Sequence, residues 1–240
     1  MRAAAIILAV LLGAGCQPAP RPAAGMAGLR VHVLAEPKAG AQPSPQRVSV
    51  YDTPAPADYG AFAKVDYSNL DQIVVWLEPV DAPAPPSSGG KISVDIDPSK
   101  TSRGIGGVTS VGQRIVLHNV SSSPQTIYSV SDGNEFDIES VPVGGRAEYT
   151  VRSAGLIEIL TNSAKENPVQ IYAAPTPWVR MTRSGESVEF NNLAPGQYRL
   201  ASWHPRLPGT QRTAKLSADQ VSDASIDVTV NTLPKVNSGG

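Results

Sequence analysis

The stretch GLIEILTNSAKENPVQIYAA, residues 155–174, contains two segments typical of β-strands, separated by a short polar loop. GLIEIL (155–160) alternates in the period of a half-buried strand, and VQIYAA (169–174) is rich in β-branched and aromatic residues. The loop TNSAKENP (161–168) lies between them. The whole stretch therefore predicts a β-hairpin.

Short strand-like segments of the same kind recur along the chain and are separated by turns rich in Gly, Pro and Ser. No long amphipathic helix can be traced after residue 30. This pattern predicts an all-β fold, a sandwich or a barrel. The further segments are 29–35, 47–52, 72–80, 91–97, 106–111, 113–120, 125–131, 146–151, 178–182, 187–193, 196–204, 209–217 and 225–232.

Composition limits the classes of function. The 240 residues suffice for one large β domain or two small ones, and 41% of them are hydrophobic, as in a globular chain. Basic and acidic residues almost balance, 20 against 21, and no basic stripe is present. Nucleic acid is therefore not an expected partner.

The N-terminus has the pattern of an export signal. Arg2 precedes an apolar run at 3–15 that is too short to cross a bilayer, and Cys16 follows two small residues. We expect residues 1–16 to be a lipoprotein-type signal, with lipidation at Cys16. Residues 17–28 are a Pro/Ala linker. The alternative is an ordinary secretory signal that is cut slightly later.

Both interpretations export the protein, and the first places it in the cell envelope. An anchor at Cys16 makes the membrane itself a partner, and Gln17 favours the periplasmic face of the outer membrane. Without an anchor the protein would be soluble in the periplasm or secreted. Cys16 is the only cysteine, so no internal disulfide can form and folding depends on core burial.

From about residue 70 to 207 the chain resembles exported proteins of the methylamine utilization protein type. Those proteins join a cupredoxin domain, a blue-copper Greek-key sandwich, to a small carboxypeptidase-regulatory-like or transthyretin-like β module. The resemblance rests on the order and spacing of seven pieces: VVWLEP (74–79), VGQRIVLHN (111–119), QTIYSVS (125–131), EFDI (135–138), GGRAEYTVRSAGLIEIL (144–160), IYAAPTPW (171–178) and SGESVEFNNLAPGQYRLASWHPRL (184–207).

The resemblance implies where copper ligands would lie. Gln125 stands at the position of the first His, Thr161 at that of the Cys, Ala164 at that of the second His and Asn167 at that of the Met. A blue-copper site needs a thiolate and two imidazoles, which these side chains cannot replace. We therefore expect a cupredoxin-like domain without copper and without another cofactor.

The resemblance also implies the division of the chain. We expect a cupredoxin-like sandwich over 29–175, a transthyretin-like or Ig-like module over 176–232 and a tail over 233–240. The least defined part of the sandwich is residues 29–70. We expect the two modules to pack as one unit because the only connection between them, residues 173–178, is short and contains two prolines. Trp178 and Trp203 are the residues expected at the junction.

Other candidate residues have simpler interpretations. His32, His118 and His204 show no ligand spacing, and His204 is expected to be structural. Asp95 and Asp97 share a strand face, where solvated carboxylates are common. The Gly-rich segment 104–107 lacks the context of a phosphate loop. The three tryptophans are expected in packing rather than in a sugar-binding surface, although that alternative stays open.

Three hypotheses of function follow. The first is an exported lipoprotein that acts as a non-enzymatic binding or scaffold module, with an unknown partner in the envelope. The second is a copper-binding electron-transfer protein, which the four substituted ligand positions oppose. The third is a hydrolase with an unrecognised site; no nucleophile–base motif is present in the sequence, but a triad assembled in space would not show there.

Overall fold

A computed structural model describes residues 21–36, 67–87, 89–99, 104–163 and 168–230 of the chain. This part is built of β-strands and one short 3-10 turn, Tyr67–Asn69, so the prediction of an all-β fold is confirmed. In these residues no helix is long and apolar enough to span a membrane. The expected strand at 47–52 and the signal segment lie outside the described residues.

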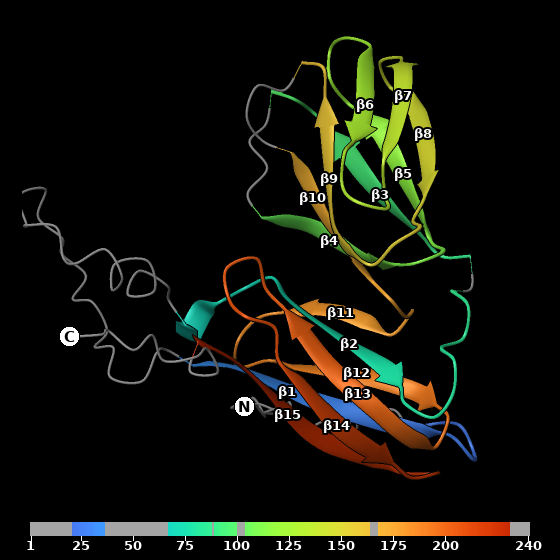
Figure 1. Ribbon diagram of the computed structural model, residues 1–240, viewed down its shortest axis with the longest axis vertical. Coiled ribbons are helices and arrows are strands. Elements are labelled where there is room, and N and C mark those ends of the chain that lie inside the picture. Colours follow the sequence, from blue (N-terminus) through green and yellow to red (C-terminus); the bar gives the residue numbers. More distant parts are fainter. Residues whose placement is uncertain (1–20, 37–66, 88, 100–103, 164–167, 231–240) are drawn as a thin grey trace, which may run out of the picture.

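The strands fall into two modules that are stacked along the long axis of the molecule (Figure 1). One, which we call the inserted module, contains β3 to β10. The other, the base module, contains β1, β2 and β11 to β15. The bounds are β1 Ala27–Glu36, β2 Ile73–Pro79, β3 Lys91–Ile96, β4 Ile105–Ser110, β5 Arg114–Asn119, β6 Gln125–Ser129, β7 Phe136–Val141, β8 Arg146–Thr150, β9 Gly155–Thr161, β10 Val169–Ala174, β11 Val179–Thr182, β12 Ser187–Leu193, β13 Gly196–Trp203, β14 Gln211–Leu216 and β15 Val221–Thr229.

The predicted division of the chain at residue 175 needs a correction. Strands β1 and β2, expected in the first sandwich, belong to the base module. β1 lies between β12 and β15, and β2 lies between β11 and β13. The alternation of β1 showed a half-buried strand, but its partners are more than 150 residues away and leave no local signal. The expected linker is also shorter, since Ala27 is already buried in β1.

The inserted module is a sandwich of two sheets. One has five strands in the order β4-β10-β9-β6-β7, and the other has three in the order β3-β5-β8. The predicted hairpin of β9 and β10 is present, with Ile157 opposite Ile171. Isoleucines at alternate positions of β9, Ile157 and Ile159, point into the core between the sheets.

The base module is also built of two sheets, with the orders β12-β1-β15 and β11-β2-β13-β14. Its core contains Leu29, Val31 and Val33 of β1, which alternate inward, together with Phe190 and Leu200. The two modules are joined by two connections, residues 80–90 and 175–178, and not by 173–178 alone as the sequence suggested.

A third hydrophobic cluster lies between the modules. Its buried members come from both sides: Val74, Trp76, Val179 and Ala201 of the base module, and Ile105, Tyr172 and Ala174 of the inserted module. The Thr176 hydroxyl in the second connection donates to the carbonyl oxygen of Leu77 at 2.5 Å. A shared apolar core of this kind favours one cooperative body over two independent modules.

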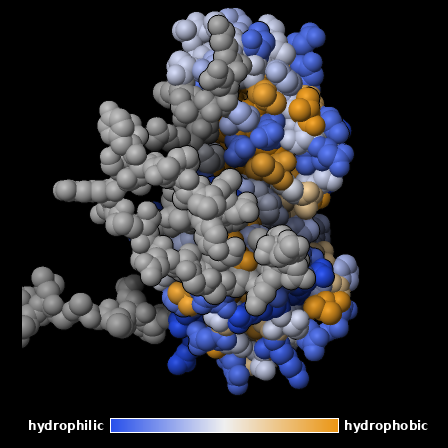
Figure 2. Space-filling view, turned by 60° about the vertical axis from the view of Figure 1, so that its left-hand side comes forward, coloured by the Kyte–Doolittle hydropathy of each residue, from blue (hydrophilic) through white to orange (hydrophobic). Residues whose placement is uncertain are grey.

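The surface is mixed in character. Figure 2 shows hydrophobic residues on the inserted module, between hydrophilic ones. The most exposed of the large apolar side chains in the described residues lie in different turns and loops, with Val130 71%, Val143 55% and Val80 53% exposed. Single exposed residues of this kind are normal on a soluble domain.

Candidate functional site

Two of the residues at the expected ligand positions, Gln125 and Thr161, lie at strand ends at the end of the inserted module farthest from the base module (Figure 1). Strands β7 and β9 end there, and β6 and β8 begin there. We call this end the polar pole and define it by Asn119, Ser121, Ser123, Gln125 and Thr161.

Gln125 is the first residue of β6. Side chains of this strand alternate, so that Gln125, Ile127 and Ser129 are buried while Thr126 and Tyr128 are half-buried. Gln125 is only 1% exposed. A buried amide at the inward position of a strand must find hydrogen bonds locally, because its desolvation is otherwise costly.

The loop between β5 and β6 supplies the partners of the Gln125 amide nitrogen. Nε2 donates to Ser123 Oγ at 2.9 Å and to Ser121 Oγ at 3.2 Å, with the Ser123 carbonyl oxygen at 3.4 Å. Oε1 of the same amide is buried and has no hydrogen-bond partner among the described residues. The Gln125 amide is therefore hydrogen-bonded through its nitrogen but not through its oxygen.

Asn119 organises the pole. It is fully buried at the end of β5, and its Nδ2 donates to the carbonyl oxygens of Ser123 and Val141, both at 2.9 Å. Its Oδ1 accepts from the Ser121 backbone N–H at 3.0 Å and from the Ser121 hydroxyl at 2.7 Å. One side chain thus fixes two loops, β5–β6 and β7–β8, in a defined geometry.

Thr161 is the last residue of β9 and is 5% exposed. It lies opposite Ile127 in the antiparallel pair of β9 and β6, so it faces the interior as Gln125 does. The next residue closes the end of this pair, since Asn162 Oδ1 accepts from the Thr126 N–H at 3.1 Å and the Asn162 N–H donates to the Thr126 carbonyl oxygen at 3.2 Å.

The structure therefore brings Gln125 and Thr161 to one end of one sandwich, on the same inward face. Ala164 and Asn167, like Cys16, lie outside the described residues. Neither Gln125 nor Thr161 offers a thiolate or an imidazole, the donors that hold copper in a blue-copper site.

His32 and His118 each pair with a residue outside the polar pole. His32 is exposed on β1, where its Nδ1 is 3.3 Å from Ser187 Oγ. His118 is in β5, and its Nδ1 is 3.1 Å from the carboxylate of Asp95 on the neighbouring β3. Asp95 therefore has a partner on its own strand face, and Asp97 instead accepts from the backbone N–H and hydroxyl of Ser99 in a turn.

His204 lies in the base module after β13 and is 5% exposed. Its Nδ1 accepts from the backbone N–H of Arg206 at 3.2 Å, which makes the neutral ring the form that the site favours. Burial, aided by the positive charge of Arg206, lowers the pKa of His204 against the opposing effect of Asp71. The buried ring bonded to backbone fits the expected structural role.

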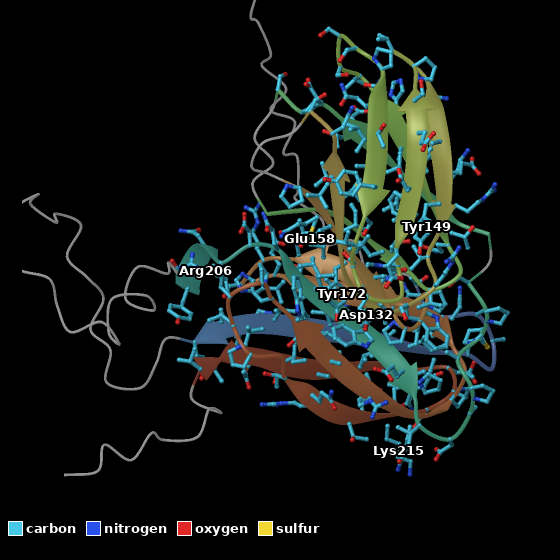
Figure 3. The ribbon with its side chains drawn as sticks, turned by 45° about the horizontal axis from the view of Figure 1, so that its top comes forward. Asp132, Tyr149, Glu158, Tyr172, Arg206 and Lys215 are labelled. Carbon is cyan, nitrogen blue, oxygen red and sulfur yellow. The ribbon has the colours of Figure 1, made fainter. Side chains whose placement is uncertain are left out.

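The tryptophans are used in packing. Trp76 and Trp203 both pack on Tyr172 in the junction, with ring centroids at 5.6 Å and 4.5 Å from the tyrosine ring. Figure 3 labels Tyr172 where the inserted module meets the base module. Trp178 instead packs on Tyr198 in the base-module core, at 5.7 Å between centroids, so its expected place at the junction is wrong.

Sequence reasoning missed the buried asparagines. Besides Asn119, Asn134 is 1% exposed and accepts from the Tyr149 hydroxyl at 3.1 Å and the Arg152 N–H at 3.0 Å. The only signal for Asn119 was its place at a strand end before a run of serines, which is equally typical of an exposed turn. Burial depends on the neighbouring β7–β8 loop and not on local sequence.

Within the described part of the chain, no group of three or more His, Cys, Asp and Glu side chains is placed to hold a metal ion. The Gly-rich segment 104–107 leads into and forms part of β4, an ordinary strand. Comparison of the chain with protein-family models, with curated proteins and with solved structures found no match.

Proposed function

We propose that the protein is an exported lipoprotein whose two-module body acts as a non-enzymatic binding or scaffold unit. In this proposal the inserted module is a cupredoxin-like sandwich that works without copper. The base module is a transthyretin-like or Ig-like β module, and lipid at Cys16 attaches the whole body to the periplasmic face of the outer membrane.

The observation that carries the proposal is the composition of the polar pole. Gln125 and Thr161 occupy the inward positions where the resemblance puts a His and the Cys, and both are buried. Two serine hydroxyls accept from the Gln125 amide, and Asn119 donates to the backbone of the same loop. Neutral oxygen and amide groups of this kind stabilise loops by hydrogen bonding but do not support electron transfer through copper.

The strand pairing of the inserted module supports the fold part of the proposal. Two of its pairings are parallel, β3 with β5 and β4 with β10, and each joins strands that are not consecutive in the chain. The chain therefore crosses between the two sheets several times. Such crossovers are expected of a Greek-key sandwich and not of a simple meander.

The shared core at the junction supports the scaffold part. A body whose modules share Trp76, Tyr172 and Trp203 presents its loops at fixed relative positions.

The experiment that would identify the envelope partner is cross-linking in intact cells of the organism that makes the protein, followed by mass spectrometry. The matched variant is Cys16→Ala, which keeps the folded body and removes the lipidation site.

The expected result is that wild-type protein pellets with membranes and cross-links reproducibly to an envelope protein, while Cys16→Ala becomes soluble and loses those cross-links. Several acyl chains bind a membrane firmly, so the change in fractionation should be nearly complete. Pelleting of the variant at the wild-type level would refute the anchor. Turnover of a substrate by the purified body would refute the non-enzymatic role.

A further inference from the structure

The amide of Gln125 is the one feature of the polar pole that the protein itself leaves incomplete. Gln125 is 1% exposed, its Nε2 has three oxygen neighbours, and its Oε1 has no partner in the described residues. Burying a carbonyl-type oxygen without a donor costs on the order of 1–3 kcal/mol. Such an atom in a folded protein calls for a specific donor.

Rotating the amide by 180° does not solve the problem. The Ser123 carbonyl oxygen, 3.4 Å from Nε2, can only accept a hydrogen bond, so the nitrogen and not the oxygen belongs beside it. The rotated form would bring two acceptor oxygens together and bury an N–H group without a partner. The arrangement of Ser123 and Ser121 thus directs Oε1 away from the β5–β6 loop.

Register indicates which residues neighbour Gln125 in the sheet. Ile127 lies opposite Thr161, so Gln125, two residues earlier on the same inward face, is a diagonal neighbour of Thr161, a separation of about 7–8 Å between such positions. Gln125 is itself opposite Val141, which is buried and apolar. The Thr161 hydroxyl has one donor and two acceptor sites, which is capacity for more than one hydrogen bond.

We propose that the polar pole is a binding site for one internal water molecule, which donates a hydrogen bond to Gln125 Oε1 and bridges it toward Thr161. Gln125, Thr161 and the two serines carry no charge, so a neutral ligand fits them better than an ion. Buried waters commonly complete buried polar groups, and one water can join two polar groups that are too far apart for a direct hydrogen bond. This site goes beyond the proposed function and does not depend on it.

The proposal is tested on the purified mature protein by crystallography at a resolution that shows ordered water, and by magnetic relaxation dispersion of water nuclei, which counts long-lived internal waters in solution. Gln125→Leu removes the acceptor, and Thr161→Val removes the hydroxyl at similar shape. Gln211→Leu is the matched control, because Gln211 is exposed on β14.

The expected result is a density peak within hydrogen-bond distance of Oε1 in the wild type, absent in Gln125→Leu, together with the loss of one long-lived water from the dispersion amplitude. Gln211→Leu should keep that water. A protein N–H or O–H group donating to Oε1 in the wild-type crystal would overturn the proposal, as would an empty, dry pole. Because the wild-type density decides, a variant that fails to fold does not block the test.

Anomalous scattering separates a water from a metal ion at the same place. A metal ion bound at Gln125 would overturn both the water site and the copper-free proposal. An empty pole without metal would overturn the water site alone and leave the proposed function standing.

Discussion

Tyr172 of the inserted module stacks on Trp203 of the base module, with ring centroids 4.5 Å apart and ring planes 27° from parallel. Trp76 also packs on this tyrosine in a tilted arrangement, and its Nε1–H donates to Glu78 at 2.8 Å. Burial, with a smaller contribution from the charge of Glu78, raises the pKa of Tyr172 to about 12. The tyrosine thus stays neutral at every physiological pH and acts as an apolar joint between the modules.

Trp203→Ala should destabilise both modules together. Truncating a large aromatic in a core costs about 3–5 kcal/mol, and the half-buried state of Trp203 places it at the lower end of that range. The wild type should unfold in one thermal transition, which the variant shifts to lower temperature without splitting it. Calorimetry measures the number and the temperature of the unfolding transitions. A shared core would be contradicted if the wild type showed two separate transitions and the substitution moved only one of them.

A double-mutant cycle measures the stacking itself. Combining Trp203→Ala with Tyr172→Leu should reveal a coupling free energy of about 0.5–1.5 kcal/mol, the range for aromatic pairs beyond their burial. Val143→Ala, at an exposed turn of the inserted module, is the control and should be additive with Trp203→Ala. Additivity of the two junction substitutions would show that the ring contact contributes nothing specific.

Gly104→Ala should weaken the same junction by a different route. Gln72, just before β2, reaches across the modules, and its Oε1 accepts from the Ile105 N–H at 3.0 Å. A Cβ on Gly104 would lie 1.9 Å from that Oε1, and the φ of +74° is already unfavourable for alanine. The substitution therefore combines backbone strain with displacement of the Gln72 amide.

Gly144→Ala is the matched control for this experiment. Its φ of +71° is nearly the same, but no atom lies within 4 Å of the added Cβ. The control should lose about 1 kcal/mol from strain alone, and Gly104→Ala should lose about 1–3 kcal/mol more through the broken hydrogen bond. Equal losses in urea unfolding would show that Gln72 can move aside at no cost.

Local pattern was sufficient to predict the all-β fold and most strands. Alternation in β6 and β9 and the β-branched residues of β2 are properties of short segments, so they can be read without knowing any partner strand. The assignment of β1 and β2 to the base module could not be predicted in this way. Both pair with strands that come more than 100 residues later, and an alternating segment fits any sheet with an apolar face.

The candidate site was predictable only in part, for a related reason. The positions of Gln125 and Thr161 followed from the resemblance, and the structure places both at one pole. The supporting residues Asn119 and Asn134 escaped notice because asparagine in a turn is usually solvated. Trp178 was misplaced because proximity to a connection does not show which face of the chain turns toward the junction.

His204 should make stability depend on pH. Burial lowers its pKa in the folded protein below the ordinary value of about 6.5, so the unfolded chain binds more protons in the interval between the two values. The neutral ring makes its full contribution to the free energy of unfolding above about pH 6.5. This contribution is lost as the pH falls toward the pKa of His204 in the folded protein. Stability should therefore decrease between about pH 7.5 and pH 5.5.

The measurement is urea unfolding at both pH values for the wild type, for His204→Gln and for the control His32→Gln, whose ring is exposed. His204→Gln should show a smaller loss of stability on acidification, while His32→Gln should behave as the wild type does. An unchanged pH dependence in His204→Gln would mean that another group titrates with unfolding. The comparison within each protein removes the general cost of the substitution.

Introducing the four ligands that the resemblance implies should test whether this end of the inserted module can hold copper. The wild type should show no strong visible absorption with excess Cu(II), because that band needs a copper–thiolate bond. The variant with Gln125→His, Thr161→Cys, Ala164→His and Asn167→Met supplies a thiolate, two imidazoles and an axial ligand. Two hydrogen bonds between the backbone of Thr126 and Asn162 hold the ends of β6 and β9 together beside positions 125 and 161.

The matched control carries the same changes but with Thr161→Ser in place of Thr161→Cys, so that it lacks only the thiolate. The full variant should bind one copper and become coloured, while the control should show at most weak tetragonal coordination by nitrogen and oxygen. Metal content and absorption spectra measure both outcomes. A tightly bound, coloured copper in the wild type would show that the ligand positions are wrongly assigned. A crystal structure of the full variant would show whether the hydrogen bonds between Thr126 and Asn162 are intact. If they are intact and the variant is still colourless, the supporting residues around Asn119 do not orient copper ligands.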